Sequence, residues 1–272
     1  MRRLLLLAVV LGAAGCGSST QHTAAPPTTA APAPQTRTTK PRPKPTSEPG
    51  SRPAPPRRCT SGAERTLGSA GRAYFAVATH GAVAYRVPGR AVLARFGATN
   101  VNGFPTTFGI VDVRFGVDCR ASWYRAQLPL RPNGLTGWIA ARDLEVRSVP
   151  ARVEVDLSAR TLTLYERGIV AWRAAVAVGS PATPTPTGRF YVNQRLVPTD
   201  THGPFGPGAI GISAFSNVLT GWTQGGPVAI HGTNEPWSIG HAVSNGCIRL
   251  PNATLSRLFK FAVAGTPVII HP

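Results

Sequence analysis

Short segments in which apolar and polar residues mostly alternate recur along residues 59–271, and turns containing Gly or Pro separate them. Alternation with a period of two places side chains on opposite faces of an extended chain, so these segments predict β-strands. They fall into two groups that meet near Pro150, and the sequence therefore predicts a mainly β protein with domains at 59–148 and 150–272. The predicted strands are 74–78, 83–87, 92–96, 110–115, 123–128, 137–140, 152–157, 161–165, 169–178, 189–193, 228–231 and 268–270.

One helix is readable near the end of the chain. Apolar residues keep helical spacing from Leu255 to Val263, Asn252 is a plausible N-cap, and Gly265 is a plausible stop. Residues 196–213 are rich in Gly and Pro, and they predict a long loop, which in a compact domain is often functional.

Residues 1–16 have the composition of an export signal. Arg2 and Arg3 precede the apolar run 4–11, and small residues lead from there to Cys16. The apolar run is too short to span a bilayer, so we expect a targeting segment outside the fold. The small-small-Cys ending resembles a lipobox, and this resemblance implies that Cys16 is lipidated.

Residues 17–58 are rich in Pro, Thr, Ala and basic residues and contain no aromatic residue. Such a segment buries too little apolar surface to offset the entropy of ordering, so disorder is predicted. Frequent Pro favours an extended chain of roughly 120 Å, at about 3.1 Å per residue. We expect a basic linker that holds a catalytic body away from a membrane.

The chain carries a formal net charge of +18. Basic chains often bind nucleic acid, but export argues against that partner, and no helix-turn-helix, zinc-finger or ribonucleoprotein pattern is present. We therefore expect no nucleic acid. Anionic cell-wall polymers or lipid head groups fit an exported basic protein better, although solubility alone explains the charge equally well.

Four cysteines divide into three roles. Cys16 is the expected anchor. Cys59 and Cys119 flank one predicted domain, and an exported chain permits a disulfide between them. Cys247 is then an odd thiol, which in an exported protein is a candidate for reactivity.

The segment 230–250 combines two histidines with a Gly-Cys turn. A cysteine needs a nearby base or a positive field to act as a nucleophile near neutral pH. Gly246 lets the backbone turn tightly before Cys247, and backbone N–H groups of such a turn can face a developing oxyanion. His231 and His241 are both candidate bases, and spacing alone does not choose between them. Their spacing with Cys247 matches no usual zinc pattern, so no metal or other cofactor is expected.

This segment resembles the signature of the L,D-transpeptidase (YkuD-type) family, which is a His, about fifteen residues, then Ser/Thr-X-Gly-Cys, an apolar residue and often Arg. His231, Cys247 and Arg249 fit that pattern, and 185–188 (Thr-Pro-Thr-Gly) matches a loop common in the family. The resemblance covers roughly 151–271. It implies an L,D-transpeptidase-type β-sandwich with one or two short helices for residues 150–272.

The first domain, 59–148, resembles bacterial SH3-like domains. The resemblance rests on the stretch from Trp123 through Pro132-Asn133-Gly134 to Ile139, where such domains have a hairpin that closes a small barrel. We expect an SH3-like β-barrel that binds wall polymer, positions the catalytic body or spaces it from its anchor.

The family resemblance implies a reaction on peptidoglycan stem peptides. Cys247 attacks the carbonyl of the third stem residue, D-alanine leaves, and the amine of a neighbouring stem resolves the thioester into a cross-link. His231 is the implied base, oriented by the carbonyl of Gly232. Arg249 is a natural counter-charge for a substrate carboxylate. The other residues implied to line the site are Ser244, Asn245 and Gly246.

Asn245 departs from the family pattern, because many members have His at this position, and a second proton carrier is therefore missing. Two other functions stay open from the sequence: an L,D-carboxypeptidase that uses water as acceptor, and a non-catalytic wall-binding protein. We expect an exported protein of the cell envelope, lipid-anchored to the outer face of the cytoplasmic membrane. The sequence does not indicate the oligomeric state.

Overall fold

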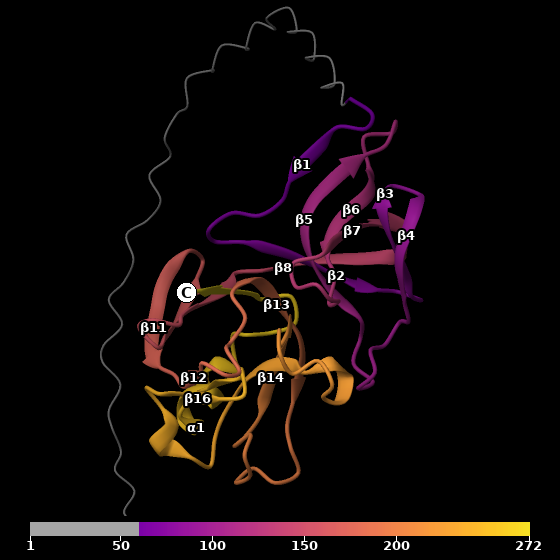
Figure 1. The fold of residues 1–272 in the computed structure, drawn as a ribbon. Helices are drawn as coiled ribbons and strands as arrows, with labels where there is room; N and C mark the ends of the chain where they lie inside the picture. Colours follow the sequence, from indigo (N-terminus) through magenta and orange to yellow (C-terminus); the bar gives the residue numbers. More distant parts are fainter. Residues whose placement is uncertain (1–59) are drawn as a thin grey trace, which may run out of the picture. The chain divides into compact units, whose positions relative to one another are not determined.

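Strands account for most of the regular structure in residues 60–272, the part of the chain that the computed structural model describes (Figure 1). This confirms the predicted mainly β fold. The predicted signal (1–16) and linker (17–58), with Cys16 and Cys59, lie outside the described residues.

The first body is one antiparallel sheet. Its strands pair in the order β4-β3-β7-β6-β5-β2-β8, and β1 pairs with β5. Apolar side chains from alternate positions of these strands form its core, as the period of two predicts. The elements are β1 (Glu64–Thr66), β2 (Ala73–Ala78), β3 (Ala82–Val87), β4 (Arg90–Phe96), β5 (Thr107–Phe115), β6 (Ala121–Gln127), β7 (Thr136–Ala140), the short 3-10 helix η1 (Ala141–Asp143) and β8 (Leu144–Val149).

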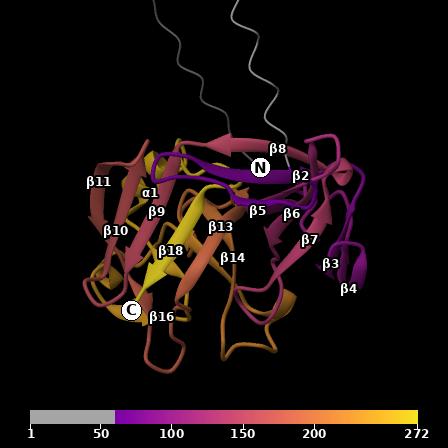
Figure 2. The same ribbon diagram turned by 90° about the horizontal axis from the view of Figure 1, so that it is seen from above.

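The second body begins directly after β8. Eight strands pair in the order β11-β10-β9-β18-β13-β14-β15-β17, and β12 pairs with β16. Figure 2 shows β9, β18, β13 and β14 lying side by side. The elements are β9 (Ala151–Asp156), β10 (Thr161–Glu166), β11 (Ile169–Ala175), β12 (Val178–Gly179), β13 (Gly188–Leu196), β14 (Ala209–Phe215), η2 (Thr223–Gly225), β15 (Pro227–His231), η3 (Pro236–Ser238), β16 (Ala242–Ser244), β17 (Ile248–Arg249), α1 (Asn252–Leu258) and β18 (Pro267–His271).

Strand β13 joins the two layers of this β-sandwich. Its first half, Gly188–Tyr191, pairs with β18, and its second half, from Val192, pairs with β14 with a register shift between Val192 and Gln194. A core of Val, Ile and Leu lies between the layers, and α1 adds Leu255 and Leu258 to it. The predicted sandwich with a short helix is therefore confirmed.

The two bodies contact each other through strand β13 and the end of strand β14. The Tyr191 hydroxyl donates to the Thr107 carbonyl at 2.8 Å, and the ring is buried. The Asn133 side chain makes two hydrogen bonds to the Phe215 backbone, at 2.7 and 2.9 Å. Gln127 donates to the Arg189 carbonyl at 2.9 Å. In each of these contacts a backbone polar group of one body has a hydrogen-bond partner in the other, as close packing of two domains requires.

Three sequence predictions differ from the structure. Residues 209–213, predicted as loop, belong to strand β14, which is buried on both faces and so shows no alternation. The helix ends at Leu258, not near Val263, and it has no side-chain cap. The Asn252 side chain instead accepts a hydrogen bond from the Thr233 N–H at 2.8 Å.

No helix within residues 60–272 is long and apolar enough to span a bilayer.

Candidate active site

The candidate site lies at the end of two parallel strands. Strand β15 pairs with β17 so that Ile230 lies beside Ile248 and His231 beside Arg249. Ile230 and Ile248 are buried in the core, so His231 and Arg249 share the opposite face. Cys247 directly precedes β17, and its thiol accepts a hydrogen bond from the backbone of Ala229, two residues before His231. The fold therefore gathers three of the predicted site residues along one short row.

A hydroxyl fixes the turn that presents Cys247. The buried Ser244 Oγ donates to the Cys247 carbonyl at 2.6 Å and accepts from the Gly246 N–H at 3.1 Å. Gly246 has a φ of 104°, a conformation that residues with a Cβ rarely adopt. Ser244 is thus a positioning residue beneath the turn, whereas the exposed Asn245 faces solvent.

The loop of residues 183–187, which overlaps the Thr-Pro-Thr-Gly segment 185–188, supports this turn through two threonines. Thr183 Oγ1 donates to the Ser244 carbonyl at 3.0 Å, and the buried Thr185 accepts from the Gly179 N–H at 2.8 Å. A Cβ on Gly179 would lie 2.4 Å from the Thr183 carbonyl oxygen, so this close approach requires glycine. The loop noted from the sequence therefore has a physical role: it fixes the strands β12 and β16 that carry the turn.

The hydrogen bonding of His231 defines its tautomer. Its Nδ1 lies 2.5 Å from the Gly232 carbonyl oxygen, which can only accept, so Nδ1 carries the proton. The lone pair of Nε2 is then free to act as a base. The Phe205 ring packs edge-to-face on the imidazole, with centroids 5.0 Å apart. His231 itself is buried.

Gly232 lies where a side chain has no room. A Cβ there would meet Asn252 Oδ1 at 2.4 Å, Pro207 Cδ at 2.8 Å and the Phe205 carbonyl oxygen at 3.1 Å. The loop before β14 and the start of α1 therefore pack closely against the backbone of Gly232, whose carbonyl orients His231. Phe205 and Asn252 carry this packing, and neither stood out in the sequence as part of a site.

Burial and charge set the protonation of the two candidate catalytic groups. Burial lowers the pKa of His231 to about 4, the Gly232 carbonyl partly offsets this, and the Arg249 charge adds to it. Burial also raises the pKa of the Cys247 thiol, against a hydrogen bond from the Ala229 backbone and the Arg249 charge. At neutral pH both groups are therefore uncharged, and the thiol must lose its proton as it reacts.

Arg249 forms an ion pair with Glu235. The guanidinium is mostly buried, at 20% exposure, whereas the carboxylate is 45% exposed. Glu235 is the one Asp or Glu that follows Asp200 in the sequence. Its backbone is held by the Thr233 hydroxyl at 2.9 Å and by Ser238, whose Oγ donates to the Glu235 carbonyl at 2.7 Å. The predicted role of Arg249 towards a substrate carboxylate stays a prediction, and such a carboxylate would compete with Glu235.

The remaining sequence candidates lie apart from this row. His241 and His202 are exposed, and the Trp237 side chain is 64% exposed on η3, so it is not part of the core. Cys247 is the free cysteine of residues 60–272, and Cys119 is disulfide-bonded. Since Cys59 lies outside the described residues, its pairing with Cys119 stays a prediction. No cluster of three His, Cys, Asp or Glu suited to a metal occurs in the same range.

Comparisons with known proteins place the second body in a family. The model of the L,D-transpeptidase catalytic domain (YkuD) matches residues 150–270. The protein YkuD of Bacillus licheniformis, named as an L,D-transpeptidase, is 40% identical over 125 residues, which cover 46% of this chain and 68% of the relative. YkuD of Bacillus subtilis is 39% identical over 124 residues, with the same two coverages.

One solved structure of this kind is the catalytic domain of an L,D-transpeptidase from E. faecium. It is 26% identical, covers 44% of this chain and 96% of that chain, and gives a TM-score of 0.33. The first body lies outside the family match, so its SH3-like character stays a prediction. The extent and identity of the matches to the second body show that the chain belongs to the L,D-transpeptidase (YkuD) family.

Proposed function

We propose that this protein cross-links peptidoglycan stem peptides through a thioester on Cys247, with His231 as the base. The observation that supports this most strongly is the parallel pairing of β15 and β17, which sets His231 beside Arg249, two residues after Cys247. The Gly232 carbonyl leaves His231 Nε2 unprotonated and so able to take a proton.

In the first half-reaction, the Cys247 thiol gives its proton to His231 as the sulfur attacks the carbonyl of the third stem residue. The Arg249 charge, next to both groups, favours the negative charge that develops on the sulfur and on the carbonyl oxygen. The bond to D-alanine then breaks, and D-alanine leaves with the proton from His231. A thioester remains on Cys247.

In the second half-reaction, the amine of a second stem peptide attacks the thioester carbonyl. His231 takes a proton from this amine and returns it to the sulfur, so that a new amide bond forms and the free thiol is restored. With water in place of the amine, the same steps release a tripeptide, as in a carboxypeptidase. The imidazole is buried and the thiol partly buried, which favours an amine already bound beside them over water as the acceptor.

We also propose that the protein acts in the cell envelope. The substrate lies outside the cytoplasm, and the signal-like residues 1–16, with Cys16 as a lipid anchor, would place the protein there. The first body would then set the position of the catalytic body relative to the wall.

The test uses the purified protein, a disaccharide-tetrapeptide and mass spectrometry of the products and of the protein. We expect a dimer that lacks one D-alanine and a transient adduct on the peptide that contains Cys247. Cys247→Ala should remove both, with a loss of activity of about a thousandfold or more.

Ser216→Ala is a suitable control, because it removes a buried hydroxyl of the same body that bonds only to the backbone of its own loop. A tripeptide without dimer would favour the carboxypeptidase. Product formation that persists in folded Cys247→Ala would disprove the proposed nucleophile.

A further inference from the structure

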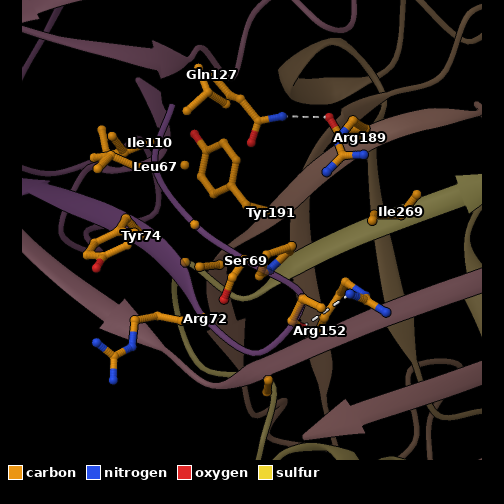
Figure 3. Close-up of a pocket in the computed structure, with 18 of the residues that line it drawn as sticks. Leu67, Ser69, Arg72, Tyr74, Ile110, Gln127, Arg152, Arg189, Tyr191 and Ile269 are labelled. Carbon is orange, nitrogen blue, oxygen red and sulfur yellow. Dashed lines mark hydrogen bonds between the residues drawn. The ribbon is translucent and has the colours of Figure 1, made fainter. Parts of the chain in front are cut away.

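A cavity lies where the first body meets the outer face of the second body's sheet. Cross-strand pairing sets Glu154 beside Ile269 and Ile269 beside Arg189, so these side chains share one face. Arg152 and Tyr191, each two residues away from a member of this row, belong to the same face. Tyr191 is covered by the first body, whereas the arginines remain at the edge of the covered area (Figure 3).

A turn of the first body closes this cavity from the other side. Ser69 and Arg72 form a small bridge, and the turn between them packs on the turn between β10 and β11. A Cβ on Gly71 would lie 2.9 Å from the Arg167 carbonyl oxygen, and Arg152 donates to the Ala70 carbonyl at 3.3 Å. The result is a cavity of about 450 Å³ and an adjoining one of about 600 Å³, which share Leu67, Ser69, Arg72 and Tyr74.

The lining of the two cavities carries a strong excess of positive charge. One carboxylate, Glu154, lies among the lining residues, and it pairs with Arg152 at 3.0 Å. Arg65 stacks on the Phe115 ring. Within residues 60–272, no hydrogen bond or ion pair engages the guanidinium groups of the other three arginines. These are Arg72, Arg167 and Arg189.

The three free guanidinium groups are spread along the cavity. Figure 3 shows Arg72 and Arg189 well apart, with Ser69 between them and Tyr74 on the side of Arg72. A single small anion would need several donors directed at one point, whereas spaced cations match an extended ligand with repeated charges. Guanidinium binds phosphate oxygens in a bidentate manner, and the hydroxyls of Ser69 and Tyr74 suit a polyol between phosphates.

We propose that this junction binds a linear phosphodiester polymer of polyol units, at a site separate from the Cys247 row. Such binding would hold the enzyme on an anionic polymer while the catalytic face stays free. The polymer site is built from both bodies, so the two must remain in contact for it to exist.

The experiment measures binding of a fluorescent poly(glycerol phosphate) oligomer to the full-length protein by anisotropy, at two salt concentrations. The test variant is the triple Arg72→Gln, Arg167→Gln, Arg189→Gln. The matched control is Arg86→Gln, Arg90→Gln, Arg173→Gln, which removes the same charge from exposed arginines outside the cavity. The basic residues 17–58 contribute equally to binding by the wild type and by the two triple variants. A difference in affinity between the two triple variants therefore reports binding at the cavity.

We expect the cavity triple to weaken binding about tenfold and to reduce its salt dependence, and the control triple to weaken it less than about twofold. Circular dichroism melting checks that both triples are folded. Equal losses in the two triples, or no binding by the wild type, would overturn the proposal. Competition by inorganic phosphate at equal phosphate concentration would show a single-anion site instead, and tighter, arginine-dependent binding to anionic vesicles would show a membrane site.

Discussion

The cores of the two bodies differ in size and in composition. Among residues 60–272, the buried core of the first body has ten apolar residues, of which five are alanine. The core of the second has twenty-one, of which three are alanine. Stabilisation by burial scales with apolar area, at about 25 cal/mol per Å². The core of the first body therefore contributes less to the free energy of unfolding, and this body depends more on its contacts with the second body.

This difference in core size matches a difference in role between the two bodies. All the residues of the candidate catalytic row, and the loops that pack on it, come from the large-core body. The first body contributes instead to the arginine-lined junction. Catalysis requires the thiol and the imidazole to keep a fixed distance and orientation, so a rigid scaffold favours it. Binding of a flexible polyanion does not require such precise geometry, so a less rigid domain can carry it.

The largest expected effect on stability comes from replacing one buried leucine by alanine in each core. Leu164→Ala removes a fully buried side chain between the layers of the sandwich and should lower the free energy of unfolding by about 3 to 4 kcal/mol. Leu128→Ala should cost about 2 kcal/mol, because Leu128 packs near Gly137 and the partly exposed Leu93, where the gap can close or admit water. Thermal and denaturant unfolding measure both values.

Activity on soluble stem peptides separates the two variants further. Leu128→Ala should retain activity at temperatures where the first body has begun to unfold, because the catalytic row lies in the other body. If Leu128→Ala lost activity in parallel with Leu164→Ala, the bodies would unfold as one cooperative unit, and the proposed difference would be wrong.

The pH dependence should come from the second body alone. Because His231 must be neutral to act as a base and its pKa lies at about 4, kcat/KM should fall about tenfold per pH unit below that value. The same shift affects stability: the unfolded chain binds the proton first, so the His231 contribution is lost as the pH falls from about 6.5 to about 4. Circular dichroism at each pH separates unfolding from loss of activity, and a decline that begins near pH 6.5 in folded protein would contradict a buried base.

The sequence predicted the strands that alternate and the residues that a motif names. The Gly246-Cys247 turn indicated a nucleophile, but spacing alone left His231 and His241 both open as the base, and only the resemblance to the family motif pointed to His231. Strand β14 was missed because its residues are almost all buried, and a strand buried on both faces has no period of two.

The supporting residues of the site could not be predicted, because their roles depend on contacts between distant segments. Phe205 reaches His231 only through the loop before β14, and Asn252 bonds to Thr233 across the start of α1. Glu235 belongs to no motif, and its ion pair with Arg249 forms only because the fold brings the two side chains together. The three free arginines of the junction come from three separate segments, namely the turn before β2, the turn between β10 and β11, and strand β13, and their convergence follows from the packing of the two bodies.

The smallest expected effect tests how far the first body depends on the second. Tyr191→Phe deletes the hydroxyl that donates to the Thr107 carbonyl, and the loss of this buried hydrogen bond should cost about 1 kcal/mol. The ring itself, which lies against Gly109, would still fill its place. Because the first body has the weaker core, the loss should appear as faster hydrogen exchange in β5 rather than in β15. Tyr124→Phe is the matched control, since no hydrogen bond engages its hydroxyl within the described part of the chain. Equal effects of the two variants would mean that the Tyr191 contact does not stabilise the first body, and that this body is stable on its own alanine-rich core.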